Sequence, residues 1–229
     1  MPVRRSRAFE RLFPEGAIAV ASRGGADEPC DLLPAESEAL GPTTKERRRE
    51  FALGRNCARR ALAALGIADF ALLRAPDRRP LWPDGIVGSI THTDSFVVAV
   101  AARRGAIDGL GIDTEIVGAV RERLWPKIAG AAEREWLAAL PHRQRAFAAA
   151  LLFSAKEAFY KCQYPRLSQR FGFHDVAVLP GPWRKDVGEF AIQIRSPASS
   201  GALPPVIGRY RRHGRYVSTG VAMLAGGAP

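Results

Sequence analysis

The segment from residue 143 to residue 164 restricts the possible folds more than any other part of the chain. It has the composition of a long helix, Pro165 is expected to end it, and its apolar side chains lie nearly all the way round, among them Phe147, Leu151 and Phe159. A helix that is apolar on every side has to be buried by neighbouring elements. The rest of the chain must therefore supply sheets or helices that enclose this segment.

Other parts of the sequence supply a second long helix and two groups of strands. Thr43 and Glu46 have the spacing of a capping box, so a helix is expected from there to about residue 65. Short strands are expected at 17–22, 87–90 and 110–116, a helix at 121–140, and a β-meander after residue 171. The apolar run 96–102 fits either a buried strand or part of a helix, and 31–44 and 67–85 have the composition of loops.

This order of elements predicts an α+β fold made of two similar parts. Each half of the chain offers one long helix and several strands, and the segment 103–109 is the plausible divider. We expect a pseudo-two-fold pair of subdomains, residues 1–104 and residues 105–229, each with a small sheet and a long helix. The two subdomains are expected to form one compact unit.

The charge of the chain favours an anionic partner. Its 229 residues include 34 Lys and Arg against 23 Asp and Glu, which is a net charge of +11. Such an excess suits a nucleic acid, a phosphorylated small molecule or an acidic protein, although a general preference for arginine explains it equally well.

The sequence offers no membrane segment and no disulfide framework. No apolar run approaches the roughly 20 residues that a membrane-spanning helix needs, and no secretory-type segment follows Met1. Cys30, Cys57 and Cys162 are too widely spaced for a zinc site, and we read them as structural cysteines. A reducing cytoplasm is the expected location.

Two acids on the expected strand 110–116 form the first candidate site. Residues i and i+2 of a strand point to the same side, so Asp113 and Glu115 project together. Two adjacent carboxylates repel each other unless a cation neutralises them, and oxygen ligands of this kind suit Mg²⁺. The alternative is a solvated strand face with two unrelated acids.

A second candidate site lies on the helix 143–164. Glu157 and Lys161 are four residues apart, a spacing that also occurs in ordinary surface ion pairs. Here the pair, together with Lys156, is embedded in an apolar helix, where charged groups usually need a partner. A metal ion with a phosphate would serve both charges, the acid on the metal and the lysines on phosphate oxygens.

Residues that suit phosphate binding precede both acidic sites. Thr91 and His92 follow an expected strand end, where His92 could instead be a turn residue bonded to backbone. Arg47 and Arg55 lie on the first long helix, and Arg78 and Arg79 lie in the loop after it. Guanidinium groups bind phosphates with two parallel hydrogen bonds, although a solvated basic face is the alternative interpretation.

Taken in order, these segments resemble the 4′-phosphopantetheinyl transferases, in particular the monomeric type that activates siderophore and polyketide synthases. The similar segments are RRREFALGRNCARRAL (47–62), WPDGIVGSITHT (82–93), LGIDTEI (110–116) and FSAKEAFYK (153–161). The resemblance runs from about residue 40 to 180. It implies two halves with coenzyme A and Mg²⁺ bound between them.

The resemblance also implies a reaction and a role for each candidate residue. The serine hydroxyl of an acyl or peptidyl carrier protein attacks the β-phosphate of coenzyme A, and adenosine 3′,5′-bisphosphate leaves. Asp113, Glu115 and Glu157 correspond to the metal ligands, with Glu157 as general base and Lys161 on the reacting phosphates. The remaining family contacts to coenzyme A fall on Arg47, Arg55, Arg78 or Arg79, Thr91, His92 and, more weakly, Lys156.

Two other functions remain open at this point. One is a different Mg²⁺-dependent nucleotide or diphosphate transferase that uses the same three acids. The other is a basic nucleic-acid-binding module, but no such signature is visible and the aromatic residues are not interleaved with the basic ones. We therefore expect a monomeric enzyme whose partners are coenzyme A and acidic carrier proteins, with no nucleic acid and no membrane.

Overall fold

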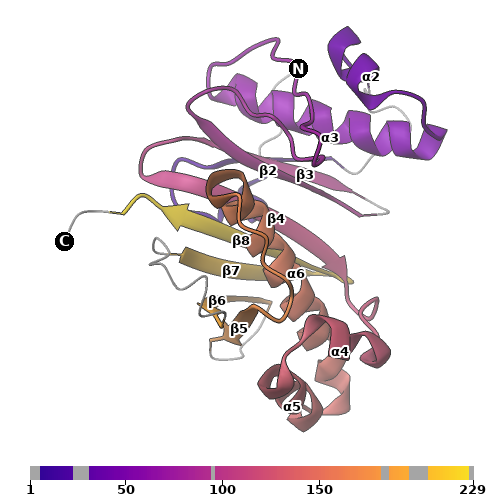
Figure 1. Ribbon diagram of the computed structural model, residues 1–229, viewed down its shortest axis with the longest axis vertical. Helices are drawn as coiled ribbons and strands as arrows, with labels where there is room; N and C mark the ends of the chain where they lie inside the picture. Colours follow the sequence, from indigo (N-terminus) through magenta and orange to yellow (C-terminus); the bar gives the residue numbers. More distant parts are fainter. Residues whose placement is uncertain (1–5, 23–30, 94–95, 182–185, 196–205, 227–229) are drawn as a thin grey trace.

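The structure, a computed structural model, describes residues 6–22, 31–93, 96–181, 186–195 and 206–226, and within them it contains two antiparallel sheets. The first sheet has the strand order β1-β3-β2 and consists of β1 (Ile18–Ser22), β2 (Ile86–His92) and β3 (Val97–Arg103). The second has the order β4-β8-β7-β6-β5. Figure 1 shows the sheets one above the other, each with a long helix packed on it. This arrangement confirms the predicted α+β fold.

The helix of the first half packs on the three-stranded sheet. This helix, α3 (Lys45–Ala64), begins one residue later than the predicted capping box, because Thr44 Oγ1 accepts a hydrogen bond from Arg47 N at 3.2 Å. Its buried face, including Leu53, Cys57 and Leu62, packs against β1 and β3. The apolar run 96–102 is therefore strand β3, and the helical alternative for it is wrong.

A short helix, α2 (Pro34–Leu40), stands where the sequence predicted a loop. Pro34 alone favours a loop, but proline is also well suited to the first turn of a helix, where its missing N–H is not needed. The helix is held in place by Glu36, a fully buried acid that accepts hydrogen bonds from Leu33 N and Leu72 N and pairs with Arg59. Near the N-terminus the chain also forms the single-turn helix α1 (Arg7–Glu10).

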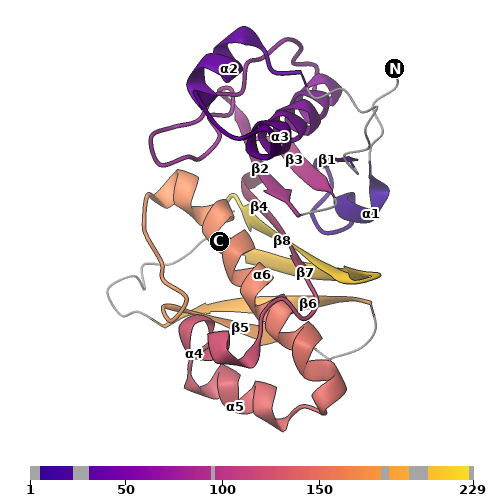
Figure 2. The ribbon, with the colours of Figure 1, turned by 90° about the vertical axis from the view of Figure 1, so that its right-hand side faces the viewer.

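The helix of the second half is α6 (His142–Leu167), which crosses the five-stranded sheet (Figure 2). It does not end at Pro165 as predicted but continues to Leu167. Ser168 N donates to Tyr164 O and closes the last turn without the proline N–H. The four strands of the predicted meander are confirmed as β5 (Val176–Pro180), β6 (Val187–Ile194), β7 (Val206–His213) and β8 (Tyr216–Leu224).

Glycines let α6 approach the strand β4 (Ile107–Ile116) more closely than any other residue would allow. A Cβ atom on Gly111 would lie 1.8 Å from Ala158 O, and one on Gly109 would lie 2.8 Å from Cys162 O. Every second residue of β4 faces the same side of the strand, and on this side they are Gly109, Gly111, Asp113 and Glu115. The side of the strand that carries the acids is therefore the side on which α6 rests.

The predicted helix 121–140 is divided into three pieces: the 3₁₀ turn η1 (Glu122–Leu124), α4 (Trp125–Ile128) and α5 (Ala131–Ala139). Pro126 lies in the first turn of α4, where its missing N–H is not needed, and the extended backbone of Ala129 separates α4 from α5. Gly130 caps α5, and its N–H donates to Glu133 Oε2 at 2.8 Å.

Other sequence-based expectations have simple outcomes. Cys57 and Cys162 are free and buried, as expected for structural cysteines, and Cys30 lies outside the described residues. No helix in the described part of the chain is long and apolar enough to cross a membrane.

Candidate active site

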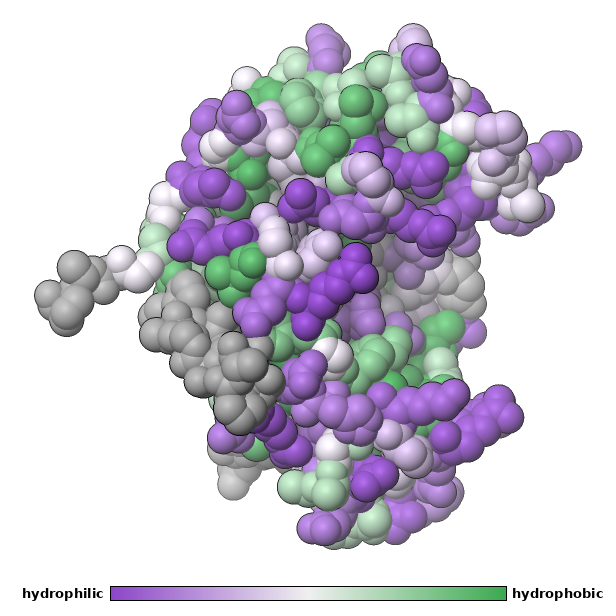
Figure 3. Space-filling view, in the orientation of Figure 1, coloured by the Kyte–Doolittle hydropathy of each residue, from purple (hydrophilic) through white to green (hydrophobic). Residues whose placement is uncertain are grey.

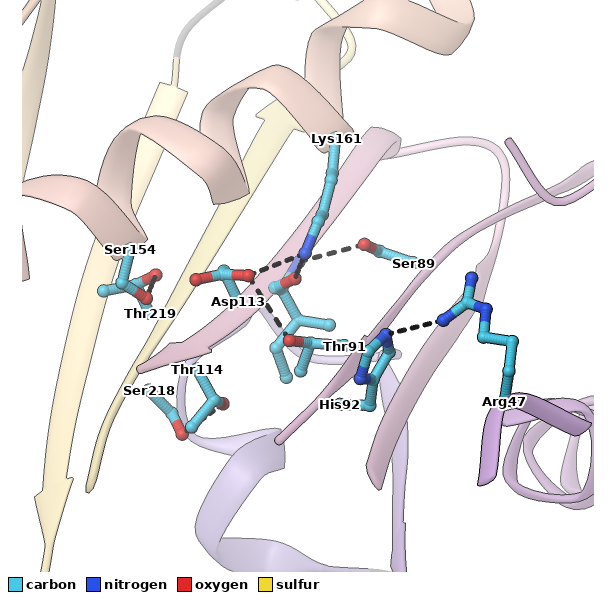
Figure 4. Close-up of polar contacts among 11 residues, drawn as sticks. Arg47, Ser89, Thr91, His92, Asp113, Thr114, Ser154, Lys161, Ser218 and Thr219 are labelled. Carbon is cyan, nitrogen blue, oxygen red and sulfur yellow. Dashed lines mark hydrogen bonds and ion pairs between the residues drawn. The ribbon is translucent and has the colours of Figure 1, made fainter. Parts of the chain in front are cut away.

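The acids of β4 lie at the junction between the two sheets. Ser89 on β2 accepts a hydrogen bond from Ile112 N at 3.1 Å, which joins β2 of the first half to β4 of the second. At this junction Asp113 is only 5% exposed, and its Oδ1 accepts a hydrogen bond from Lys161 Nζ at 2.7 Å and one from Thr91 Oγ1 at 3.3 Å (Figure 4). The structure thus brings together one predicted residue from each of β2, β4 and α6.

Among the described residues, one oxygen of this carboxylate has no hydrogen-bond partner. Asp113 Oδ2 is buried and accepts no hydrogen bond from any residue that the structure describes. A buried carboxylate oxygen is costly to leave unsatisfied. It is therefore a candidate contact for a bound cation or for a hydrogen-bond donor outside the described residues.

Glu115 and Glu157 belong to the same electrostatic cluster. Burial raises the pKa of Glu115 to about 7, and the charges of Asp113 and Glu157 act in the same direction while Lys161 opposes them. Burial also raises the pKa of Glu157, where Lys161 again lowers it and Asp113 raises it. Each acid thus feels the others, as expected for carboxylates that share a site.

These residues suit a Mg²⁺ ion, although they do not form a closed cage for one. No three His, Cys, Asp or Glu side chains in the described ranges are close enough together to hold a metal as they stand. Mg²⁺ is commonly held by one or two carboxylates and completes its shell with water and substrate phosphate. The open oxygen of Asp113 and the mutual repulsion of the acids fit that chemistry.

A cleft of about 270 Å³ opens beside this cluster, between the two halves. Its wall in the first half comes from the loop 77–82 and from β2, and its wall in the second half comes from α6. Arg78 and Arg79 line the first wall, and Glu157 and Lys161 line the second. On the face shown in Figure 3, hydrophilic side chains gather across the middle of the molecule, where the halves meet.

A second hollow of about 210 Å³ meets this cleft at Glu157 and Tyr160. Its other walls are largely aromatic, with Phe159, Phe171 and Phe173. The charged cleft therefore shares two lining residues with a groove along α6 whose other walls are largely aromatic.

The predicted phosphate ligands divide into those at the cleft and those away from it. Arg79 Nη1 donates to Pro165 O at 3.3 Å across the cleft, and Arg78 beside it is exposed. Arg47 Nη1 lies 3.5 Å from His92 Nε2 at the exposed end of β2, and burial lowers the pKa of His92. Arg47 also pairs with Glu50 and Arg79 with Asp77, both as partly exposed ion pairs that an anionic ligand could replace.

Two predicted ligands have other roles. Arg55 is 6% exposed, donates from Nε to Leu72 O at 2.8 Å and lies over the ring of Phe51. Thr91 is 3% exposed and uses its hydroxyl hydrogen on Asp113. Their predicted contact with coenzyme A is not supported, because both side chains are buried and engaged within the protein.

Lys156 also differs from the prediction. Its ammonium group is buried and donates to Glu133 Oε2 at 2.7 Å, to Ile128 O at 2.8 Å and to Phe173 O at 2.8 Å. These three bonds use all three N–H groups, so none is left for a phosphate. The helical angle between Lys156 and Glu157 turns one side chain into the core and the other towards the cleft.

The sequence analysis gave no role to two tyrosines of the site. Tyr160 and Tyr164 line the cleft, and their rings stack at 5.0 Å. The spacing of four residues between the tyrosines was a usable signal, because it places them on the same side of α6 as Glu157 and Lys161. Glu133 carried no signal, since it looks like any acid near a helix start.

Comparison with known proteins gives consistent matches along the chain. The family model "4′-phosphopantetheinyl transferase N-terminal domain" matches residues 35–102, and the model "4′-phosphopantetheinyl transferase superfamily" matches residues 109–201. The chain is 35% identical over 206 residues to 4′-phosphopantetheinyl transferase Svp of Streptomyces mobaraensis, covering 89% of this chain and 80% of the relative.

Two further similarities cover less of the chain. It is 38% identical over 150 residues to 4′-phosphopantetheinyl transferase PptT of Mycobacterium tuberculosis, covering 64% of each protein. A solved holo-(acyl-carrier-protein) synthase from Bacillus anthracis superposes on 53% of this chain and 100% of its own, with a TM-score of 0.43 and 18% identity.

Proposed function

This chain belongs to the 4′-phosphopantetheinyl transferase superfamily, and from that premise we propose how its residues transfer the phosphopantetheine arm of coenzyme A to a carrier protein. The observation that carries the proposal is the carboxylate of Asp113, with one open buried oxygen, beside Lys161 at a cleft between the halves. We also propose that the two halves are residues 1–104 and 105–229, a division that the separate sheets support.

Coenzyme A is proposed to bind with its phosphates in the cleft. Arg78, Arg79, Arg47 and His92 supply positive charge or donors at its rim, and Lys161 supplies an ammonium group on the opposite wall. Asp113, Glu115 and Glu157 would hold a Mg²⁺ ion, which when bound supplies charge neutralisation at the diphosphate. Such chemistry asks the protein mainly for positioning and charge stabilisation.

The reaction forms one P–O bond and breaks one. The serine oxygen of the carrier protein bonds to the β-phosphorus of coenzyme A, and the bond from that phosphorus to the bridging oxygen breaks. The serine proton passes to Glu157, whose raised pKa makes its carboxylate a better base. Adenosine 3′,5′-bisphosphate leaves with the bridging oxygen, and Lys161 stabilises the charge on it.

The carrier protein is proposed to be acidic. The net charge of +11 would attract such a partner and speed its encounter with the cleft. Siderophore and polyketide synthases are the proposed source of the carriers, and we propose a cytoplasmic monomer. Size-exclusion chromatography with light scattering tests the oligomeric state.

The direct test is a mass measurement. Incubation with coenzyme A, Mg²⁺ and an apo carrier protein should raise the mass of the carrier by one phosphopantetheine and release adenosine 3′,5′-bisphosphate. The same mixture with EDTA should give no product. An unchanged carrier mass across acyl and peptidyl carriers would favour the other candidate, a transferase that acts on a different diphosphate substrate.

A further inference from the structure

The closest partner of the acid cluster is a side chain of the protein itself. Lys161 Nζ lies 2.7 Å from Asp113 Oδ1 and also donates to Ile112 O at 3.3 Å. The lysine side chain thus folds back onto β4, although it starts on α6 and is 29% exposed at the cleft. In Figure 4 it reaches down from α6 to the carboxylate of Asp113.

Lys161 acts on the whole cluster and not on Asp113 alone. Its charge opposes the rise in pKa of both Glu115 and Glu157. Lys161 is therefore bonded to Asp113 and near enough to Glu115 and Glu157 for its charge to act on both. In the described residues, no three of the acids are gathered closely enough to hold a metal as they stand.

The same lysine is also within reach of the ligand side. It lines the cleft with Arg78 and Arg79, and its long side chain has several rotatable bonds through which the ammonium group can turn from Asp113 to the cleft. The contacts to Asp113 and Ile112 O use two of the three N–H groups of Lys161, so at most one is left for a phosphate while that pair is formed. A cation that takes over Asp113 would free Lys161 for the cleft.

From this geometry we propose that Lys161 occupies the cation position of the acid cluster until Mg²⁺ binds, and that it then leaves Asp113 and turns to the diphosphate. The inference rests on the proposed function, because it assumes that the acids hold the metal. It makes metal binding and substrate binding cooperative through one side chain. Metal entry both fills the acid cluster and supplies the cleft with a free ammonium group.

The test measures metal binding without coenzyme A, using Mn²⁺ as the probe and electron paramagnetic resonance of the free ion as the signal. The variant Lys161→Met removes the competing charge and keeps the length of the side chain. It should bind Mn²⁺ on the order of tenfold more tightly than the wild type, because no ammonium group then competes with the ion for Asp113; a tenfold change corresponds to about 1.4 kcal/mol. Equal or weaker binding would overturn the proposal.

A matched control separates direct competition from the general field of the cleft. Arg79→Met also removes one cation from the cleft. Arg79, however, pairs with Asp77 and donates to Pro165 O, and within the described residues it has no such contact with the acid cluster around Asp113. It should change the affinity for Mn²⁺ by less than about twofold. If Arg79→Met raised the affinity for Mn²⁺ as much as Lys161→Met does, the gain would come from the electrostatic potential of the cleft and not from direct competition for Asp113.

A second measurement needs no variant that could misfold. In the wild-type protein with ¹⁵N-labelled lysine, addition of Mg²⁺ without coenzyme A should shift the Nζ resonance of Lys161 and leave that of the exposed Lys127 unchanged. An unmoved Lys161 resonance at saturating Mg²⁺ would refute the exchange. Carrier modification by the wild type is measured in parallel, so a failed exchange and a failed function give different results.

Discussion

Replacing Lys156 by methionine should separate the role that the structure assigns to this residue from the role that its place beside Glu157 predicts. The side chains of Lys156 and Glu133 are 2% and 5% exposed and their charged atoms lie 2.7 Å apart. Glu133 also accepts hydrogen bonds from Gly130 N at 2.8 Å and Val178 N at 3.0 Å. The pair therefore ties α6 to the start of α5 and to the edge strand β5.

The expected loss can be worked out from these contacts. Removing one partner of a buried ion pair costs about 3–5 kcal/mol, because the other charge stays buried without compensation. For a chain of 229 residues each kcal/mol lowers the melting temperature by about 2–4 °C, so Lys156→Met should melt roughly 10 °C below the wild type. The exposed Lys127→Met is the control and should change it by less than about 2 °C.

The assay combines unfolding with kinetics. The double variant Lys156→Met with Glu133→Gln leaves no unpaired buried charge. Its loss in free energy of unfolding should therefore be about 1–3 kcal/mol smaller than the sum of the losses in the two single variants. Below its melting transition, Lys156→Met should keep the wild-type KM for coenzyme A. A tenfold higher KM at unchanged melting temperature would refute the reasoning and return Lys156 to the phosphate site.

Three further predictions concern other residues. Asp113→Asn should lower transfer by about 100-fold or more at a nearly unchanged melting temperature, since the stabilising pair with Lys161 and the repulsion from Glu115 are lost together; carrier mass and calorimetry check this. Arg55→Met should lower the free energy of unfolding in urea by about 1–3 kcal/mol, because its guanidinium donates to the buried carbonyl of Leu72. The ratio of the KM values for coenzyme A and dephospho-coenzyme A should stay the same. Burial lowers the pKa of His213 below 6.5, so the unfolded chain binds more protons than the folded one and stability should fall as the pH drops through 6.5; unfolding at pH 7.5 and 5.5 should show this loss, and His213→Gln should reduce it.

The sequence predicted those features that depend on local spacing. Alternation along a strand placed Asp113 and Glu115 on one side of β4, and the helical interval placed Glu157 and Lys161 on one side of α6. Both relations hold whatever the rest of the chain does. The motif residues could therefore be selected before the fold was known.

The failures concern features that depend on tertiary contacts. Lys156 and Lys161 are both lysines of one helical motif, yet one is buried on Glu133 and the other lies at the cleft. Arg55 has the same sequence character as Arg47, but it lies beneath the loop that contains Leu72. Packing decides which side of a helix faces the core. The sequence of α6 is apolar on all sides, so it does not indicate which side is buried.

The effect of proline on a helix also depends on tertiary structure and hydrogen bonding. Pro34 begins α2, Pro126 lies in the first turn of α4, and Pro165 lies inside the last turns of α6. The residue removes one N–H donor in every case, but only the position within the hydrogen-bond ladder decides whether that donor is needed.

The contact of α6 with bare backbone at Gly109 and Gly111 has a consequence for how variants of this protein should be interpreted. The two glycines carry no chemical group, yet they set the separation between the strand with Asp113 and the helix with Glu157 and Lys161. A single methyl group at residue 111 would wedge these elements apart and misalign groups that it never touches. Inactive variants at such positions would report on spacing, and a screen that scores only reactive side chains would overlook them.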